Sequence, residues 1–452
     1  MALSSLFTIS TSSLFAHQKA LAVTASNIAN ANNPAYTRQV VMFGTAPPDH
    51  RAYFSFGSGV NVDKVLRVRN NVTDTQIRNN NQKYYDAEKQ STVLKQVETL
   101  FSEPSEYGLS NLMTSFFNSW DELAVDPHST ALRTTVAQSA QNLSEKISSI
   151  YKGITQTKLD TKNEAIDTVN KINTIVEQLH TVNSQVYEAH VIGSFDNDLV
   201  DKRDALLDEL SQYANINVSI DENEVANVSI GGVFAVDGLH HVKFELKQKD
   251  EKLILQTNGE EIKTNLQGGS LNALFGLYNN QLPEQIKKLD EISTTIMENV
   301  NAIHSKGYSI TDPPQTGIDF FTGYEDGVLE INQDILDDPF NIAISSNGTD
   351  GNNEVALKIA ALKGEKILND RTLTDNYSDF ISGVANKIRL EDQNQESYGL
   401  VLHQLNQQKA EYSGVSTDEE MVNIVEYQKS YDAAAKLIKV ADDLLQTLIN
   451  MV

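Results

Sequence analysis

Heptad repeats at the two ends of this 452-residue chain constrain its fold more than any other feature. The C-terminal repeat alternates steps of three and four residues through Ile424, Tyr427, Tyr431, Ala434, Ile438, Ala441, Leu445, Leu448 and Val452. The N-terminal repeat places an apolar residue at every seventh position, preceded by one more: Leu3, then Phe7, Leu14, Leu21 and Ile28. A period of about 3.5 residues is typical of a helix that packs along another helix. The sequence therefore predicts an assembly protein whose ends pair with each other or with neighbouring copies.

Composition excludes several classes of partner and chemistry. The formal net charge is −25, from 36 Lys and Arg against 61 Asp and Glu, so neither nucleic acid nor an anionic membrane is expected as a partner. The chain has no cysteine, which rules out thiolate metal sites and cysteine nucleophiles. No apolar run approaches the roughly 20 residues of a membrane span. The first residues also lack the basic and apolar regions of a secretory signal.

Hydrophobic periodicity predicts long helices interrupted by one β segment. Helices are expected over about 4–31, 62–101, 129–190, 353–367 and 374–412, and along the C-terminal repeat. From Asn215 the apolar period falls to about two residues, and Asp237-Gly238 and Asn258-Gly259 predict hairpins. Helix resumes at Leu271, with a break expected at Pro283. We therefore expect a mainly α fold with β, namely a long-helix bundle with paired terminal coiled-coil helices and a small inserted β-domain.

This pattern divides the chain into three parts. They are a terminal helical assembly domain (1–36 with 415–452), a helical-bundle body with short strands (37–213 with 271–414), and the inserted β-domain (214–270). Ser10, His17 and Thr24 occupy the companion heptad positions of the N-terminal repeat. Because these side chains are polar, we expect the N-terminal helix to be marginal alone and both ends to be mobile in the dilute monomer.

No residue set indicates catalysis, a cofactor or a metal, so no enzyme activity is expected. His240-His241 lies at an expected turn, and His304 near a helix end; structural roles are expected for both. Four acidic residues between Asp196 and Asp204 are spaced somewhat like a calcium loop. The run has Asp201 where such a loop needs glycine. It therefore predicts a capped helix start with an acidic first turn.

Several segments carry a resemblance to a known family. At the ends they are Leu21-Ala22-Val23-Thr24-Ala25-Ser26-Asn27-Ile28-Ala29-Asn30, Asn33-Pro34-Ala35-Tyr36-Thr37-Arg38-Gln39 and Ser413-Gly414-Val415-Ser416-Thr417-Asp418-Glu419-Glu420. In the interior they are Phe116-Phe117-Asn118-Ser119-Trp120, Asn197-Asp198-Leu199-Val200-Asp201-Lys202-Arg203-Asp204 and Val300-Asn301-Ala302-Ile303-His304-Ser305-Lys306-Gly307-Tyr308. The terminal segments resemble those of bacterial flagellar rod, hook and hook-associated proteins. The interior segments are similar to the hook-associated protein 1 (FlgK) family.

The resemblance implies a structural component of the flagellum that polymerises as an adaptor at the hook–filament junction, outside the cell. It implies as partners further copies of the chain, the hook protein and a second hook-associated junction protein. Because the C-terminal stripe is apolar on a chain exported unfolded, we also expect a cytosolic export chaperone to cover about 421–452. The alternatives are another axial protein (the hook protein or hook-associated protein 3) and a cytosolic coiled-coil scaffold.

Overall fold

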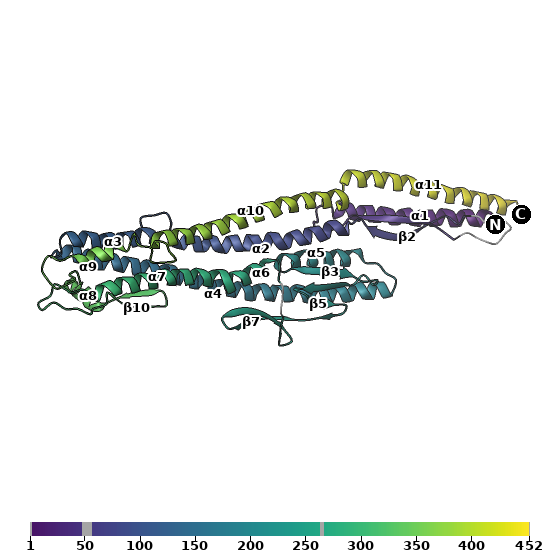
Figure 1. Cartoon of the computed structure of the whole chain (residues 1–452). Helices are drawn as coiled ribbons and strands as arrows, with labels where there is room; N and C mark the ends of the chain where they lie inside the picture. The colour runs from purple at the N-terminus through teal and green to yellow at the C-terminus, as the bar shows by residue number, and fades with distance from the viewer. Residues whose placement is uncertain (1, 48–56, 263–265, 452) are drawn as a thin grey trace. The chain divides into compact units, whose positions relative to one another are not determined.

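The structure is a computed structural model that describes residues 2–47, 57–262 and 266–451. Helices dominate it, which confirms the mainly α class with some β (Figure 1). In chain order the α-helices are α1 (Ala2–Ala29), α2 (Asn71–Phe101), α3 (Leu109–Val125), α4 (Thr130–Val191), α5 (Asn197–Tyr213), α6 (Ser270–Gly276), α7 (Leu282–His304), α8 (Gln333–Asp337), α9 (Glu354–Ala361), α10 (Leu373–Ser413) and α11 (Thr417–Asn450). Val452, the last residue of the predicted C-terminal repeat, lies outside the described residues.

Within the described residues the strands form four antiparallel sheets. They are β1 (Gln39–Thr45) with β2 (Val60–Arg67); β3 (Ile216–Ile220), β4 (Ala226–Ile230), β5 (Val233–Asp237) and β6 (His240–His241); β7 (Phe244–Lys249), β8 (Lys252–Thr257) and β9 (Glu260–Glu261); and β10 (Phe321–Glu325) with β11 (Val328–Ile331). The predicted turns are confirmed, because Asp237-Gly238 joins β5 to β6 and Asn258-Gly259 joins β8 to β9. Asn258 and Gly259 both have positive φ angles, 51° and 81°, as a type I′ hairpin turn requires.

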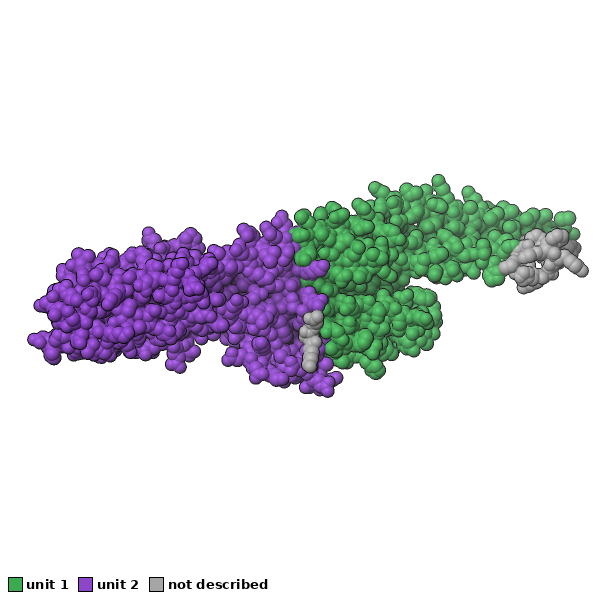
Figure 2. All heavy atoms as spheres, viewed as in Figure 1, with its two compact units in different colours: residues 1–82, 172–243, 397–452 green, residues 83–171, 244–396 purple. Residues whose placement is uncertain are grey.

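Contacts divide the chain into two compact units, coloured separately in Figure 2. Unit 1 contains residues 1–82, 172–243 and 397–452, and unit 2 contains residues 83–171 and 244–396. The β3–β6 sheet thus belongs to unit 1 and the β7–β9 sheet to unit 2, where the sequence suggested one β-domain. The three-part division by folding domains stays a prediction.

Two asparagines fasten these sheets to helices. In unit 1, Asn183 of α4 is fully buried, and its amide donates to the Ala226 carbonyl at 2.8 Å and accepts from the Ala226 N–H at 3.1 Å. In unit 2, Asn279 bonds both backbone groups of Leu253 in β8, at 2.7 and 3.0 Å. A strand bonded to a side chain through both backbone groups is held in one register. Each sheet is therefore fixed to the helix of its own unit.

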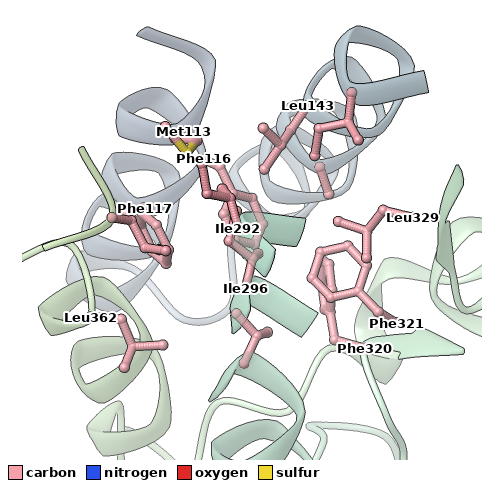
Figure 3. Packing of buried hydrophobic residues seen from close by; sticks show 14 of the residues in the cluster. Met113, Phe116, Phe117, Leu143, Ile292, Ile296, Phe320, Phe321, Leu329 and Leu362 are labelled. Carbon is pink, nitrogen blue, oxygen red and sulfur yellow. The ribbon is translucent and has the colours of Figure 1, made fainter. Parts of the chain in front are cut away.

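The core of unit 2 contains Phe116 to Trp120, one of the interior segments that carry the family resemblance. Phe116 and Trp120 of α3 are fully buried, and their ring centroids lie 6.0 and 5.3 Å from that of Phe320. Ile292 and Ile296 of α7 pack in the same cluster (Figure 3). Such aromatic contacts contribute about 0.5–1.5 kcal/mol per pair beyond the area that they bury.

Another such segment, Val300 to Tyr308, lies at the end of α7 and forms hydrogen bonds with the turn-rich region that follows it. Asn301 accepts from the N–H groups of Phe320 and Phe321, both at 3.0 Å. His304 is fully buried; its Nδ1 lies 2.7 Å from the Ile318 carbonyl and its Nε2 accepts from the Ala343 N–H at 2.9 Å. These partners require a neutral ring protonated on Nδ1. Burial lowers the pKa of His304 to about 4, against the opposing effect of its bond to Ile318. The expected structural role is confirmed.

Three helix boundaries differ from those predicted. The helix expected over 353–367 ends at Ala361. Residues 62–67 belong to strand β2, and α2 begins only at Asn71. Val62 and Val65 are half-buried among exposed neighbours, and pairing with β1 supplies the backbone bonds of this stretch. The predicted break at Pro283 is also wrong, because α7 begins at Leu282 and runs through it. A π-helical turn, Leu277–Gln281, precedes α7, so proline falls in the first turn, where its missing N–H costs little.

Candidate assembly site

The terminal helices α1 and α11 lie side by side in unit 1, with the marked chain ends at the same end of the pair (Figure 1). Asn27 near the end of α1 contacts Glu420 at the start of α11, so the two helices are antiparallel. The fully buried side chains on these helices are small or polar: Ser10, Ala16, Ala20, Thr24 and Asn27 on α1, and Glu420, Ala434 and Ala441 on α11. Small side chains allow two helix backbones to approach closely.

The predicted seam residues border this line of small side chains. The half-buried ones are Leu3, Phe7, Leu14, Leu21, Ile28, Ile424, Tyr427, Tyr431 and Ile438. Leu445 and Leu448 are more exposed, at 36% and 50%. The structure thus brings most of the seam residues to the pair, and their part in assembly stays a prediction.

The three polar positions of the N-terminal repeat lie inside the pair. Ser10 and Thr24 are buried, and the Ser10 hydroxyl donates to the Leu6 carbonyl of its own helix at 2.8 Å. The ring of His17 lies 5.5 Å from Phe43 of β1 and 6.2 Å from Tyr427 of α11. Burial lowers the pKa of His17, which keeps the ring neutral and compatible with this packing. The Ser10 hydroxyl is therefore satisfied within its own helix although it is buried.

A second apolar stripe runs along α11 beside the face that α1 covers. Leu437, Val440, Leu444 and Leu448 recur at steps of three and four, and each is 44–50% exposed. Nearer the start of α11, Met421, Val422 and Val425 line a hollow of about 480 Å³. A helix that is apolar over more of its surface than one partner covers is typical of assembly with further helices.

A polar cluster, which we call the terminal cluster, joins the two ends of the chain. It consists of Asn27, Tyr36, Arg38, Gln39 and Glu420. Glu420 is 2% exposed and accepts from Arg38 Nε at 2.8 Å and from Asn27 Nδ2 at 3.2 Å. Asn27 Oδ1 accepts from the Gln39 N–H at 3.0 Å and from the Tyr36 hydroxyl at 2.8 Å. Every member comes from a terminal segment that carries the family resemblance.

Next to it in unit 1, arginines surround two buried aspartates of α5. Asp201 accepts from the Thr37 N–H at 2.9 Å and from the Thr37 hydroxyl at 2.6 Å. Asp204 lies within 2.7–3.0 Å of Arg67, Arg69 and Arg203. Burial alone would raise the pKa of Asp204, but these guanidinium groups outweigh it and lower the pKa to about 2. The cluster thus ties the segment that follows α1 to α5.

Sequence reasoning assigned different roles to these acidic residues. The predicted cap is confirmed for Asp196, whose carboxylate accepts from the N–H groups of Asp198 and Leu199. Asp201 and Asp204 bind arginines, where the sequence predicted only an acidic first turn. The sequence holds two signals for arginine binding. Arg67 and Arg69 lie two residues apart, and in a distant segment Asp201 and Asp204 lie three residues apart, on one face of a helix.

The described residues can be compared with the requirements of a metal site and of a membrane-spanning helix. Across the residues that the structure describes, no group of three or more His, Asp or Glu is arranged to hold a metal ion. His180 and His241 are close, with ring centroids 4.5 Å apart, but only as a pair. None of the helices in the described ranges is long and apolar enough to cross a membrane.

Comparison with known proteins agrees with this architecture. The model of the flagellar hook-associated protein FlgK helical domain matches residues 94–321, half of the chain. The ends match the models of the flagella basal body rod protein (7–37) and of the C-terminal region of the flagellar basal body rod FlgEFG protein (406–451).

Full-length relatives and a solved structure are also similar. Flagellar hook-associated protein 1 of Bacillus subtilis is 29% identical over 97% of this chain and 96% of its own length. The protein of the same name from Salmonella typhimurium is 22% identical over 99% of this chain and all of its own. The flagellar hook junction protein FlgK from Burkholderia pseudomallei aligns with a TM-score of 0.63 over 75% of this chain and 100% of that chain, at 14% identity, which supports the fold alone.

The paired terminal helices, the helical body and these matches define a structural axial protein of the bacterial flagellum. The chain belongs to the FlgK family of hook-associated proteins, the axial components of the hook–filament junction, as the resemblance implied.

Proposed function

We propose that the chain polymerises outside the cell, after export through the flagellar channel, between the hook protein and a second hook-associated junction protein. The second stripe on α11 carries the proposal, because α1 leaves Leu437, Val440 and Leu444 uncovered. Apolar side chains along a helix are stabilised when another helix covers them, by about 25 cal/mol per Å² of apolar area buried. In a polymer, a terminal helix of the next subunit supplies that cover.

Replacing Val440 with Asp tests this stripe. The side chain is 50% exposed in the single chain, so the free energy of unfolding should change by no more than about 0.5 kcal/mol. In the polymer the carboxylate would be buried without a partner, at a cost of several kcal/mol in each subunit contact. Cells that carry only the variant should keep hooks, lose filaments and release flagellin into the medium. Filament counts by electron microscopy and flagellin in the culture supernatant measure this.

Two further variants separate the faces of α11. Gln428→Asp places the same charge on an exposed, polar side of the helix and should leave filaments normal. Ile438→Asp acts on the half-buried face next to α1 and should lower helix content as well as abolish assembly. Normal filaments from the Val440 variant would contradict the assembly role of the stripe.

An export chaperone is part of the same proposal. Before export the apolar side chains of α11 would promote aggregation, so a cytosolic partner with an apolar groove should cover about 421–452. In cells blocked for export, deletion of 421–452 should remove the co-purifying chaperone, and deletion of the similarly long α1 should not. Chaperone binding that survives loss of 421–452 would refute this part.

The family is one of structural flagellar proteins and is not a known class of enzyme. The absence of enzyme activity in this chain stays a prediction.

A further inference from the structure

We propose that Asn27, Arg38 and Glu420 act as a register lock, which allows α1 and α11 to pair in one alignment. The lock is a property of the single chain. Its consequence for assembly rests on the proposed function, because the alignment decides which apolar residues of α11 are left uncovered. The three residues form the buried centre of the terminal cluster.

The two buried alanines of α11 do not by themselves fix the alignment. On α11 the buried interface positions after Glu420 are Ala434 and Ala441, which lie one heptad apart and are identical. A slip of seven residues, about 10 Å along the helix, would exchange one alanine for the other. The same slip would bring Leu448 to the place of Ala441 and move Tyr427 away from His17, so packing also favours the observed alignment. In heptad-paired helices a buried polar residue adds to packing in selecting one alignment.

The polar lock does discriminate between alignments. After a slip, the buried Glu420 carboxylate would lose both Arg38 and Asn27, and an unpaired buried charge is strongly disfavoured. Arg38 cannot follow the slip, because its N–H donates to the Ser413 carbonyl at 3.0 Å and its carbonyl accepts from the Val68 N–H at 2.8 Å.

Asn27 is also fixed in position by its hydrogen bonds. Its amide donates to Glu420 and to the Gln39 carbonyl, and its oxygen accepts from Gln39 and Tyr36. These bonds use both donors and both acceptor positions of the side chain. The lock therefore links the end of α1, the turn after it and the start of α11 in one arrangement.

Pairs of introduced cysteines can read the alignment, because the chain has no other cysteine. His17→Cys with Tyr427→Cys reports the observed alignment, since these two rings lie 6.2 Å apart. His17→Cys with Ala434→Cys reports a slip of one heptad. The rate of cross-linking by a short bifunctional thiol reagent is measured for each pair in the purified full-length chain. With the lock intact, the first pair should react at least about tenfold faster, as expected for buried charged hydrogen bonds.

Glu420→Leu removes the lock and places an apolar side chain in the buried position. The ratio of the two rates should fall toward one while helix content by circular dichroism is kept, since an apolar replacement of a buried ion pair can preserve stability. Glu419→Leu is the matched control, because Glu419 is 62% exposed and its loss leaves Glu420 with both partners. If Glu420→Leu fails to fold, Glu420→Gln keeps the shape and removes only the charge.

An unchanged ratio of the two cross-linking rates in a folded Glu420 variant would overturn the lock. Equal rates for the two cysteine pairs in a chain that keeps Glu420 would overturn it too. These rates do not depend on polymerisation. A chain with one alignment that still fails to build filaments would therefore argue against the proposed function and leave the lock standing.

Discussion

Asp204→Asn should destabilise unit 1 by about 3–5 kcal/mol, the usual cost of removing one partner from a buried ion pair. Asp204 is 4% exposed and is bonded or paired to Arg67, Arg69 and Arg203, each within 3.0 Å. The amide that replaces it has no charge, so the guanidinium groups would lose their shared partner while Asp201 and Asp74 remain. Peptide-resolved hydrogen exchange and urea unfolding measure the loss, which should be confined to unit 1.

Asp198→Asn on the same helix is the control, since Asp198 is exposed and the change should cost less than about 0.5 kcal/mol. Acid gives a second test. The folded pKa of Asp204, about 2, lies below its unfolded value, so its stabilising effect is complete above about pH 4 and is lost as the pH falls toward 2. Over that range the wild-type chain should lose more stability than the Asn variant. Equal losses, or an Asn variant as stable as wild type at pH 7, would refute the role given to this carboxylate.

The sequence was informative wherever a short-range rule sets the structure. Helix α4 was expected over about 129–190 and spans Thr130–Val191, because an unbroken apolar period specifies a long helix. Helix α10 was expected to end near residue 412 and ends at Ser413, just before Gly414, where a Cβ would lie 2.3 Å from the Ala410 carbonyl oxygen. Both are local consequences of residue type.

Long-range contacts were not predictable in this way. The heptads correctly placed α1 beside α11 and included Ala434 and Ala441, but they did not reveal that the polar Ser10 and Thr24 are buried. Nor does any local pattern show that Thr37 meets Asp201, 164 residues away. Polar residues within the terminal motifs were the available signal, because a buried Asn or Glu needs partners that the fold must supply.

Arg133→Met should destabilise unit 2 by about 2–4 kcal/mol, since buried carbonyls would lose charged hydrogen bonds worth about 1.5–3 kcal/mol each. Arg133 of α4 is fully buried, and its guanidinium donates to the carbonyls of Pro127, Pro339 and Ile342 at 2.9, 3.3 and 2.8 Å. Burial lowers the pKa of Arg133 to about 10, so the group remains charged at neutral pH. The charged form is destabilised by the loss of its hydration. Methionine has a similar length and no charge. The substitution therefore removes the hydrogen bonds while keeping most of the packing.

The loss should appear as faster hydrogen exchange in residues 338–345, which those bonds hold against α4, and as a lower urea midpoint for unit 2. Arg389→Met on α10 is the matched control, because Arg389 is exposed and bonds only Asn386 among the contacts that the structure gives it. The 338–345 segment takes no part in the proposed assembly contacts, so hooks and filaments should still form at low temperature. An Arg133→Met variant as stable as wild type would show that the free-energy cost of burying the guanidinium equals the stabilisation from its hydrogen bonds. Some buried ion pairs behave in this way, because apolar residues replace them without loss of stability. In that case the segment would be held by the apolar contacts of Ile342 and Ile344 and by the hydrogen bond from the Ala343 N–H to His304.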